Sequence, residues 1–489
     1  MDSSYLLQAI SDCQQALATK PEDSEAWQAA FRNLGNLLQG MGEFDRAIVW
    51  HSLALENQPA LAEVYCQLGG LYVLEKNWIE ALTCFQTAAL HQPDSAQIYA
   101  NLAQIYGQLQ QREAEMECWY KATKINPNLV NSRGYYKLGK ALEQKGRTEE
   151  AIACYQQASQ GENSLLAATY ELAEISLRQG KLDQAKANFE QVLQSAPNEA
   201  NAQYKLGTIY FQEQCFEEAI DCFRQTIKNA PDFPWAYRDL VKTFLHLQRW
   251  DEAIATCYAI INLVEPFPWV YIHLGNALRE KGQIAEAANN FRYACASHNW
   301  HRCLENSYFF TYDVFSFRIP IWQEHLQPLL NTEEIKIVEV GCHQGMSACW
   351  LLDNILIHPG DKLICIEPQF APKLKENLAR TGAESKVNLL EGDVHRHLNS
   401  LEENSIDLVN LQDKRKQPDY VEQSAILSWK LLKQEGILVF NDYGWVNPAY
   451  PEQQPKLGID RFLESIKNQW ELVHQVPQAF QLIIRKRSA

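Results

Sequence analysis

The amino-acid sequence predicts two kinds of fold in one chain. An all-α solenoid of stacked helix pairs comes first, and an α/β domain built on a mostly parallel sheet follows it. Over the first three hundred residues, a leucine followed by a small residue recurs at a near-constant spacing. That spacing is lost from about residue 294, and beyond residue 330 short β-rich runs alternate with helical segments. The change of pattern predicts a multidomain protein.

The recurring pair is a leucine followed in most units by glycine or alanine. Successive leucines are 34 residues apart, with one step of 36. An alanine follows thirteen residues after most of them, and an aromatic residue often lies four residues beyond that alanine. A period of this length is typical of solenoids built from one repeated supersecondary unit. The leucines are Leu34, Leu68, Leu102, Leu138, Leu172, Leu206, Leu240 and Leu274.

Each period predicts a pair of helices. The leucine and its small neighbour lie on the first helix, where the small residue lets the second helix approach closely. The alanine and the aromatic residue, spaced i and i+4, share one face of that second helix. A proline ends several units because it cannot continue a helix. One helix pair cannot bury its apolar face, so the units are expected to stack.

This pattern resembles the tetratricopeptide repeat over roughly residues 1–295, as about eight repeats after a leading half-repeat at residues 4–21. The resemblance implies a groove that binds a protein or peptide partner. The alternative is a scaffold whose groove has no ligand, or which only self-associates. The third unit departs from the pattern, because Glu115 stands where alanine is expected and the next step gains two residues. Its local packing is therefore expected to differ.

The composition excludes several classes of function. Of 489 residues, 44 are Lys or Arg and 60 are Asp or Glu, so the formal net charge is −16. This charge argues against nucleic acid as a partner and against docking on an anionic membrane. No apolar stretch approaches the length of a membrane span, and the N-terminus does not look like a signal peptide. With 13 scattered cysteines, a cytoplasmic location is expected.

The segment after the repeats brings together Cys295, His298, His301 and Cys303. Their spacing does not match a common zinc finger or ribbon. We therefore interpret it as a polar terminal helix or linker and expect no metal site. The predicted organisation is a solenoid at residues 1–295, a linker at residues 296–310 and an α/β domain at residues 311–489.

The C-terminal part alternates predicted strands with predicted helices. This alternation indicates a parallel sheet with helices on both faces. Residues 470–476 and 479–486 are expected to add an antiparallel hairpin. The predicted strands are residues 335–340, 362–367, 386–392, 406–411 and 436–441, and the predicted helices are residues 345–357, 370–382, 418–433 and 456–468.

The first predicted strand ends in a loop that contains Glu339, Gly341 and Gly345. Parallel sheets bind ligands beyond the carboxyl ends of their strands, at the point where the strand order reverses. Gly341 permits a tight turn, and Gly345 lets a ligand approach the backbone. The helix that follows, with Ser347 in its first turn, offers N–H groups to an anionic carboxylate. The loop therefore predicts a cofactor site.

Acidic residues after the next two strands indicate which cofactor the loop binds. Glu367 ends the second strand, 22 residues beyond Gly345, where a carboxylate can accept hydrogen bonds from ribose hydroxyls. Asp393 follows the third strand, near the expected place of an adenine ring. A dinucleotide site prefers the pattern GxGxxG, but this loop has GxxxG. The set favours S-adenosylmethionine over NAD, although glycines that only shape a turn remain the alternative.

The C-terminal part resembles the class I S-adenosylmethionine-dependent methyltransferases over about residues 306–487. The matching stretches are PIWQEHL at 320–326, VEVGCHQGMSACWLLDNILIHPGDKLICIE at 338–367, LSWKLLKQEGILVFNDYGW at 427–445 and PKLGIDRFL at 455–463. The resemblance implies a Rossmann-like fold with a mostly parallel seven-stranded sheet. It also implies O-methylation of a small-molecule or sugar hydroxyl.

In this family an aspartate after the fourth strand and acids after the fifth hold a divalent cation, and the sequence departs from that pattern. Gln412 stands where the resemblance places the aspartate, and Arg415 stands where it places a histidine. After the fifth strand, Asn441 and Asp442 stand where two acids are expected. Hard cations favour carboxylate oxygens, so magnesium is expected to bind weakly, unless Asp413 contributes. Asp442, Asn441 and Arg415 are the candidate catalytic residues, with Arg415 placing a cation in the acceptor pocket.

Two functional hypotheses follow from these departures. The first is a methyltransferase that works without metal on an acceptor needing little activation, with the repeats recruiting a partner. The second is a non-catalytic interaction scaffold that carries a degenerate methyltransferase domain. The neutral side chains of Gln412 and Asn441 support the second hypothesis, whereas the ordered cofactor residues support the first.

Overall fold

The computed structural model describes Ser11, Tyr450 and residues 33–57, 62–160, 165–263, 267–332, 334–412, 415–446, 452–476 and 481–487. The chain forms two compact units, Met1–Ile209 and Tyr210–Ala489. The predicted half-repeat at residues 4–21 lies outside the described residues, apart from Ser11. Within the described ranges, every helix is too short or too polar to cross a bilayer.

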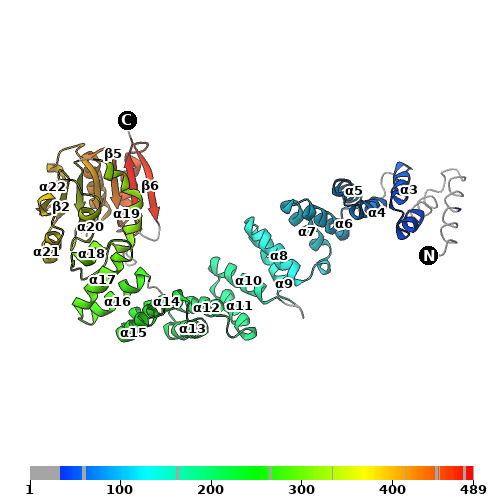
Figure 1. The fold of residues 1–489 in the computed structure, drawn as a ribbon, viewed down its shortest axis with the longest axis horizontal. Coiled ribbons are helices and arrows are strands. Elements are labelled where there is room, and N and C mark those ends of the chain that lie inside the picture. The colour runs from blue at the N-terminus through cyan, green and yellow to red at the C-terminus, as the bar shows by residue number, and fades with distance from the viewer. Residues whose placement is uncertain are drawn as a thin grey trace. The chain divides into compact units, whose positions relative to one another are not determined.

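The first unit is helical throughout its described part (Figure 1). After a helical stretch at residues 33–40, antiparallel pairs follow one another, and a short 3₁₀ turn, Pro127–Leu129, separates α7 from α8. The helices are α3 Phe44–Asn57, α4 Ala62–Leu74, α5 Trp78–His91, α6 Ala96–Gln108, α7 Arg112–Ile125, α8 Ser132–Gln144, α9 Thr148–Ala158, α10 Leu166–Arg178, α11 Leu182–Ser195 and α12 Ala200–Gln212, which runs into the second unit.

The helices of a repeat approach closely where the small residue meets the aromatic one. A Cβ added at Gly69 would lie 2.7 Å from the Phe85 ring, and one at Gly139 would lie 2.6 Å from the Tyr155 ring. The alanines of these second helices, such as Ala81, are fully buried. The predicted role of the small residue is thus confirmed, because any side chain there would push the helix pair apart.

The third repeat packs differently, as its sequence predicts. Glu115 replaces the usual alanine, and a Cβ added at Gly107 would lie 3.2 Å from its carboxylate. A cavity of about 430 Å³ opens between α7 and α8, with Met116, Trp119 and Val130 among its lining residues. The longer connection and the larger side chain together explain why these two helices do not close onto each other.

The first repeat has a histidine at the aromatic position. The His51 ring is fully buried, lies against Gly35, and neither of its nitrogens has a partner among the described residues. Burial lowers the pKa of His51 from 6.5 to about 4. The folded protein therefore holds a neutral imidazole that the unfolded chain would protonate near pH 6.

We predict that His51→Phe raises the free energy of unfolding of the first unit by about 1–2 kcal/mol, because it removes two unpaired buried polar atoms. The wild type should lose stability as the pH falls below 6.5, levelling off near pH 4, whereas the variant should lack this component. Urea unfolding of the full chain at pH 7 and pH 5 measures both effects. An equal loss of stability in both proteins between these pH values would contradict the prediction.

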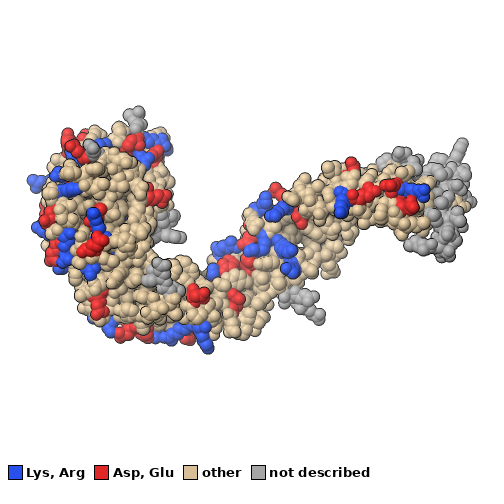
Figure 2. All heavy atoms as spheres, in the orientation of Figure 1, with Lys and Arg blue, Asp and Glu red and all other residues tan. Residues whose placement is uncertain are grey.

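The second unit begins with further helix pairs and continues into the α/β domain. A Cβ at Gly275 would lie 2.5 Å from the Phe291 ring, so the repeat packing persists here. On the face that Figure 2 shows, acidic and basic side chains are interspersed. The helices of this part are α13 Phe216–Asn229, α14 Pro234–His246, α15 Trp250–Ile261, α16 Pro268–Glu280, α17 Ile284–Ala296 and α18 Arg302–Glu305.

The α/β domain contains a seven-stranded sheet of order β3-β2-β1-β4-β5-β7-β6. Strands β1 to β5 are parallel, β7 is antiparallel to β5, and β6 is antiparallel to β7. The predicted fold class and the terminal hairpin are confirmed. The strands are β1 Lys336–Val340, β2 Lys362–Glu367, β3 Val387–Glu391, β4 Ile406–Leu411, β5 Leu432–Phe440, β6 Trp470–Val476 and β7 Gln481–Lys486.

The sheet separates two apolar cores, and helices cover both (Figure 1). The strand order reverses between β1 and β4, which predicts a ligand site beyond the carboxyl ends of these two strands. The helices observed are slightly shorter than expected, and β5 begins four residues earlier than predicted. The helices of the α/β domain are α19 Ile319–His325, α20 Met346–Asn354, α21 Pro372–Arg380, α22 Val394–Ser400, α23 Pro418–Leu431 and α24 Pro455–Ser465.

The segment between the repeats and the sheet, residues 296–310, is packed into one of these cores. The Trp300 indole donates to the Asp353 carboxylate at 2.8 Å, and the Tyr308 hydroxyl donates to the same oxygen at 2.9 Å. Arg292, on α17, donates to the Tyr308 carbonyl at 3.0 Å. The last repeat helix is therefore joined to α20 through a buried hydrogen-bonded cluster around Asp353.

Candidate functional site

The loop between β1 and α20 requires glycine at two positions. Gly341 has φ +87° and Gly345 has φ +84°, a region that favours glycine. A Cβ at Gly341 would overlap the Gln412 carbonyl oxygen and lie 2.5 Å from its carbon. A Cβ at Gly345 would lie 2.7 Å from Leu374. The loop is thus pressed against the ends of β4 and α21, and only glycine allows this approach.

Glu339 lies at the centre of a buried polar group beside this loop. Its Oε1 accepts hydrogen bonds from the Ser347 hydroxyl and, at 3.2 Å, from Asn410 Nδ2. Its Oε2 is buried and has no partner among the described residues. Burial raises the pKa of Glu339 to about 7, with nearby Glu367 adding to the rise and the two hydrogen bonds opposing it. Ser347, expected to bind a ligand carboxylate, instead donates to Glu339.

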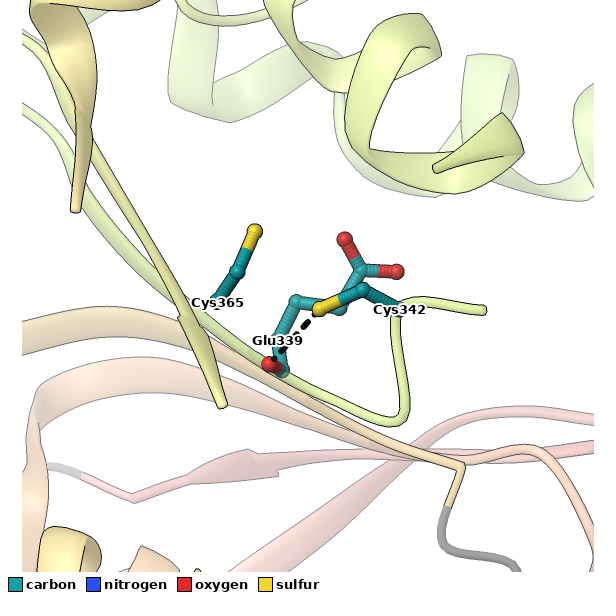
Figure 3. A group of neighbouring side chains, drawn as sticks. All are labelled: Glu339, Cys342 and Cys365. Atoms are coloured by element: carbon teal, nitrogen blue, oxygen red, sulfur yellow. Dashed lines mark hydrogen bonds between the residues drawn. The ribbon is translucent and has the colours of Figure 1, made fainter. Parts of the chain in front are cut away.

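Two cysteines lie next to Glu339, and the three could be taken for a metal centre (Figure 3). Their candidate ligand atoms lie within 4.8 Å of one another. The Cys342 thiol donates to the Glu339 carbonyl oxygen at 3.3 Å, the dashed line in Figure 3. Burial raises the pKa of Cys342 well above its usual value, and its hydrogen bond with Cys365 adds to this. In its neutral form this buried thiol packs in the core of the domain.

Glu367 ends β2 and faces the same loop. It is buried, and its Oε1 accepts the His343 backbone N–H at 2.9 Å. The Gly392 N–H donates to the Glu367 carbonyl at 2.9 Å, which brings the end of β3 alongside. Asp393 follows Gly392 but caps α22, because its carboxylate accepts the Arg396 N–H at 2.8 Å. The structure therefore brings the predicted cofactor residues to one edge of the sheet.

A segment before the sheet covers this edge, and sequence reasoning missed it. The Thr311 N–H donates to Gln344 Oε1 at 2.8 Å, and Gln344 Nε2 donates back to the Thr311 hydroxyl at 2.7 Å. Tyr312 lies edge-on to His343, with ring centroids 6.3 Å apart. Asn377 is fully buried and donates to the Phe309 and Gln344 carbonyls. No local pattern marked these residues, since their partners are distant in sequence.

Asn441 holds the ends of several strands together. Its Nδ2 donates to Asn410 Oδ1 at 2.5 Å, and its Oδ1 accepts from Gln481 Nε2 at 2.6 Å. Because Asn410 also donates to Glu339, a chain of buried hydrogen bonds runs across β1, β4, β5 and β7. Both polar atoms of the Asn441 side chain are thus used within the protein.

Asp442, the predicted acid of the acceptor side, forms an ion pair with Lys416. Both line a narrow crevice whose other walls include Leu411, Phe440 and Ile459. Arg415, expected to place a cation in this pocket, is exposed and lies over the Tyr420 ring at 4.6 Å. The cation that meets Asp442 is therefore the next residue, Lys416. Asp413 lies outside the described residues.

Family models match both halves of this architecture. A model described as a methyltransferase domain matches residues 338–443, and tetratricopeptide-repeat models match residues 96–129, 132–160, 170–232 and 213–266. The chain carries tetratricopeptide repeats and a methyltransferase domain. This confirms the predicted fusion of a repeat array with a methyltransferase-like domain. The methyltransferase match runs from β1 to just beyond β5 and so includes the β1–α20 loop and Asp442.

Several solved structures are similar to part of this chain. YrrB, described as a repeat protein with an unusual peptide-binding site, is 21% identical and covers 46% of this chain and 94% of its own, with a TM-score of 0.25. PilF of Pseudomonas aeruginosa is 21% identical and covers 45% and 97%, with a TM-score of 0.29. MamA is 18% identical and covers 41% and 91%, with a TM-score of 0.23. No curated protein matches the chain.

Proposed function

We propose that the methyltransferase domain transfers a methyl group from S-adenosylmethionine to an oxygen atom of a small acceptor, while the repeats recruit a protein or peptide partner. The observation that carries the proposal is the arrangement around the β1–α20 loop. There a glycine loop and the buried carboxylates of Glu339 and Glu367 meet at the strand-order reversal. A methyltransferase domain implies S-adenosylmethionine in general, and these residues suit it.

The residues present fit the methyl donor. Glu339 Oε2 is a buried oxygen with no partner among the described residues, so it is suited to a cationic group of the donor. The proposal assigns recognition of the ribose hydroxyls to Glu367, which ends β2, and recognition of the adenine to Asp393, which follows β3. Because the Gly341, His343 and Gly345 N–H groups donate within the protein, the N-terminus of α20 is the part that would hold the carboxylate. When bound, S-adenosylmethionine supplies an electrophilic methyl group on its sulfonium.

Methyl transfer is an in-line displacement, so the main task of the protein is to position the acceptor. The crevice beside Asp442 and Lys416 is the proposed acceptor site. Apolar side chains form part of its walls, and the ion pair offers a hydrogen-bond acceptor and a donor. Asn441 keeps this wall in place through its partners on β4 and β7. Arg415 lies outside, where it could meet an acidic acceptor at the rim.

Calorimetry of the full chain with S-adenosylmethionine tests the proposal. Binding is expected at micromolar to millimolar concentrations, with S-adenosylhomocysteine competing for the same site. If millimolar S-adenosylmethionine produces no heat of binding, the proposed function is wrong. Thermal unfolding of the same sample shows that the protein is folded, so that a negative result is meaningful.

We predict that the affinity for S-adenosylmethionine rises about tenfold between pH 6 and pH 8, because Glu339 ionises over this range and attracts a cationic ligand. In Glu339→Gln the rise should disappear, while Ser347 and Asn410 keep an acceptor oxygen. Any titration of the ligand itself affects both proteins equally, so the difference between their pH profiles of affinity reports the ionisation of Glu339. A Gln variant with the same pH profile as the wild type would contradict this role.

A second candidate function is a scaffold without turnover. The neutral Gln412 and the fully engaged Asn441 favour it, since neither can activate an acceptor by accepting its proton. This alternative predicts that the donor binds while no methyl group is transferred. Incubation of the chain with methyl-labelled S-adenosylmethionine and a small-molecule extract separates the two functions, because labelled product appears only with a catalyst.

A further inference from the structure

A buried arginine lies between the ends of β4 and β5. Arg318, immediately before α19, is 5% exposed. Its Nη1 donates to Gln412 Oε1 at 3.3 Å, and its Nη2 donates to the Asn441 carbonyl at 3.1 Å. Gln412 and Asn441 follow neighbouring parallel strands. The guanidinium thus bridges the two positions where the family resemblance places ligands of a divalent cation.

The Arg318 guanidinium brings a positive charge to the space between Gln412 and Asn441. An arginine side chain does not deprotonate in proteins, so the guanidinium is positively charged. The Phe317 ring lies under the guanidinium at 4.9 Å. Its Nε is buried and has no partner among the described residues. A fixed positive charge is therefore built into the end of the sheet.

The surrounding donors do not fit a divalent cation. Asn441 uses both side-chain polar atoms within the sheet, and Gln412 turns its oxygen to Arg318. Asp442, the carboxylate of this set that lies among the described residues, forms an ion pair with Lys416. Magnesium and manganese prefer carboxylate oxygens, and a guanidinium already occupies the space between the two strand ends. The residues present disagree with the metal that the resemblance implies.

We propose that Arg318 takes the place of the divalent cation and makes this methyltransferase site independent of metal. The inference rests on the proposed function, because a divalent cation is expected between Gln412 and Asn441 only if this is a methyl-transfer site. Arg318 acts as a positioning residue: it joins the loops after β4 and β5 and supplies positive charge beside Asp442. Neutral amides, Gln412 and Asn441, stand at the two positions where carboxylates would hold a dication.

The test is a gain of metal binding when the arginine is removed together with the amides. The probe is Mn²⁺, followed by electron paramagnetic resonance and calorimetry on the full chain. The triple variant Arg318→Met/Gln412→Asp/Asn441→Asp is expected to bind one Mn²⁺ on the order of 100-fold more tightly than the wild type. The double variant Gln412→Asp/Asn441→Asp is expected to stay close to the wild type, because Arg318 pairs with the new carboxylate at position 412 and keeps its place between the strand ends.

A matched variant separates charge from volume. Arg318→Lys with the same two aspartates keeps one positive charge, so it should stay close to the double variant. If the double variant binds Mn²⁺ as tightly as the triple variant, Arg318 does not occupy the cation position and the proposal is wrong. Wild-type binding of Mn²⁺ that disappears in Asp442→Asn would also overturn it, even if the triple variant fails to fold.

Failure of the role proposed for Arg318 can be distinguished from failure of the proposed function. Binding of S-adenosylmethionine to the wild type is measured separately, and the manganese titrations need no turnover. A chain that binds neither donor nor metal would lose the proposed function, while the metal comparison among the variants could still be read. A chain that binds the donor and also binds Mn²⁺ through Asp442 would keep the function and lose the role of Arg318.

Discussion

Gly341→Ala is expected to abolish binding of S-adenosylmethionine and to lower the stability of the second unit by about 3 kcal/mol. A non-glycine residue at φ +87° costs about 1–2 kcal/mol. The new Cβ would also overlap the Gln412 carbonyl oxygen, and crowding of this kind costs about 1–3 kcal/mol more. Relief requires the loop to move away from β4, which would break the hydrogen bond from the His343 N–H to Glu367. Calorimetry and denaturant unfolding measure the two effects.

A matched control for Gly341→Ala exists in the same domain. Gly382, in the turn after α21, has φ +69° and no atom within 4 Å of an added Cβ. Gly382→Ala therefore carries the backbone cost without the steric overlap, and should lose only about 1 kcal/mol while donor affinity stays unchanged. If the two alanine variants behave alike, the close approach of the loop to Gln412 is not what the glycine provides.

Asp353→Ala is expected to destabilise the second unit by about 2–4 kcal/mol, because it leaves the Trp300 indole and the Tyr308 hydroxyl buried without an acceptor. Asp353 lies in α20, the helix that follows the cofactor loop. Loosening this helix should therefore also weaken donor binding. Denaturant unfolding and donor titration of the full chain measure the two changes.

Asp353→Asn provides the comparison, since it keeps one acceptor oxygen and should lose less stability than the alanine variant. The pair also tests the domain boundary. If residues 296–310 act as a simple linker, the alanine substitution should change stability by no more than about 0.5 kcal/mol, as surface substitutions usually do. That small value would contradict the cluster around Asp353 as the joint between α17 and α20.

The repeat architecture could be predicted because its determinants recur locally. Leu68 and Gly69 repeat at a fixed distance, and Phe85 follows at the spacing that places it against the glycine. The sheet was predictable for a similar reason, since a buried parallel strand such as Ile406–Leu411 is a continuous apolar run. Element boundaries were less certain, as the early start of β5 illustrates. Pairing with β4 adds residues that no periodicity marks.

The neighbourhood of the predicted cofactor residues could also be predicted, whereas the contacts around the predicted acceptor residues could not. Gly341 and Glu367 belong to short motifs tied to the ends of adjacent strands, so their neighbourhood follows from topology. Arg318 lies 94 residues before its partner Gln412, in a segment with no motif. Arg415 was expected in the pocket, but Lys416 faces Asp442 instead. A shift of one residue in a loop reverses which side chain points inward, and sequence spacing does not determine it.

By itself the sequence determined the stacked helix pairs, the mostly parallel sheet and the edge of that sheet at which Glu339, Gly341 and Glu367 meet. These features depend on periodicity and on strand order, which can be read from patterns of residues that are close together in the sequence. Only the tertiary structure decided that Ser347 serves Glu339, that Trp300 and Tyr308 join the repeats to α20, and that a guanidinium lies between Gln412 and Asn441. Buried polar groups must find partners wherever the fold places them, and those partners are distant in the chain.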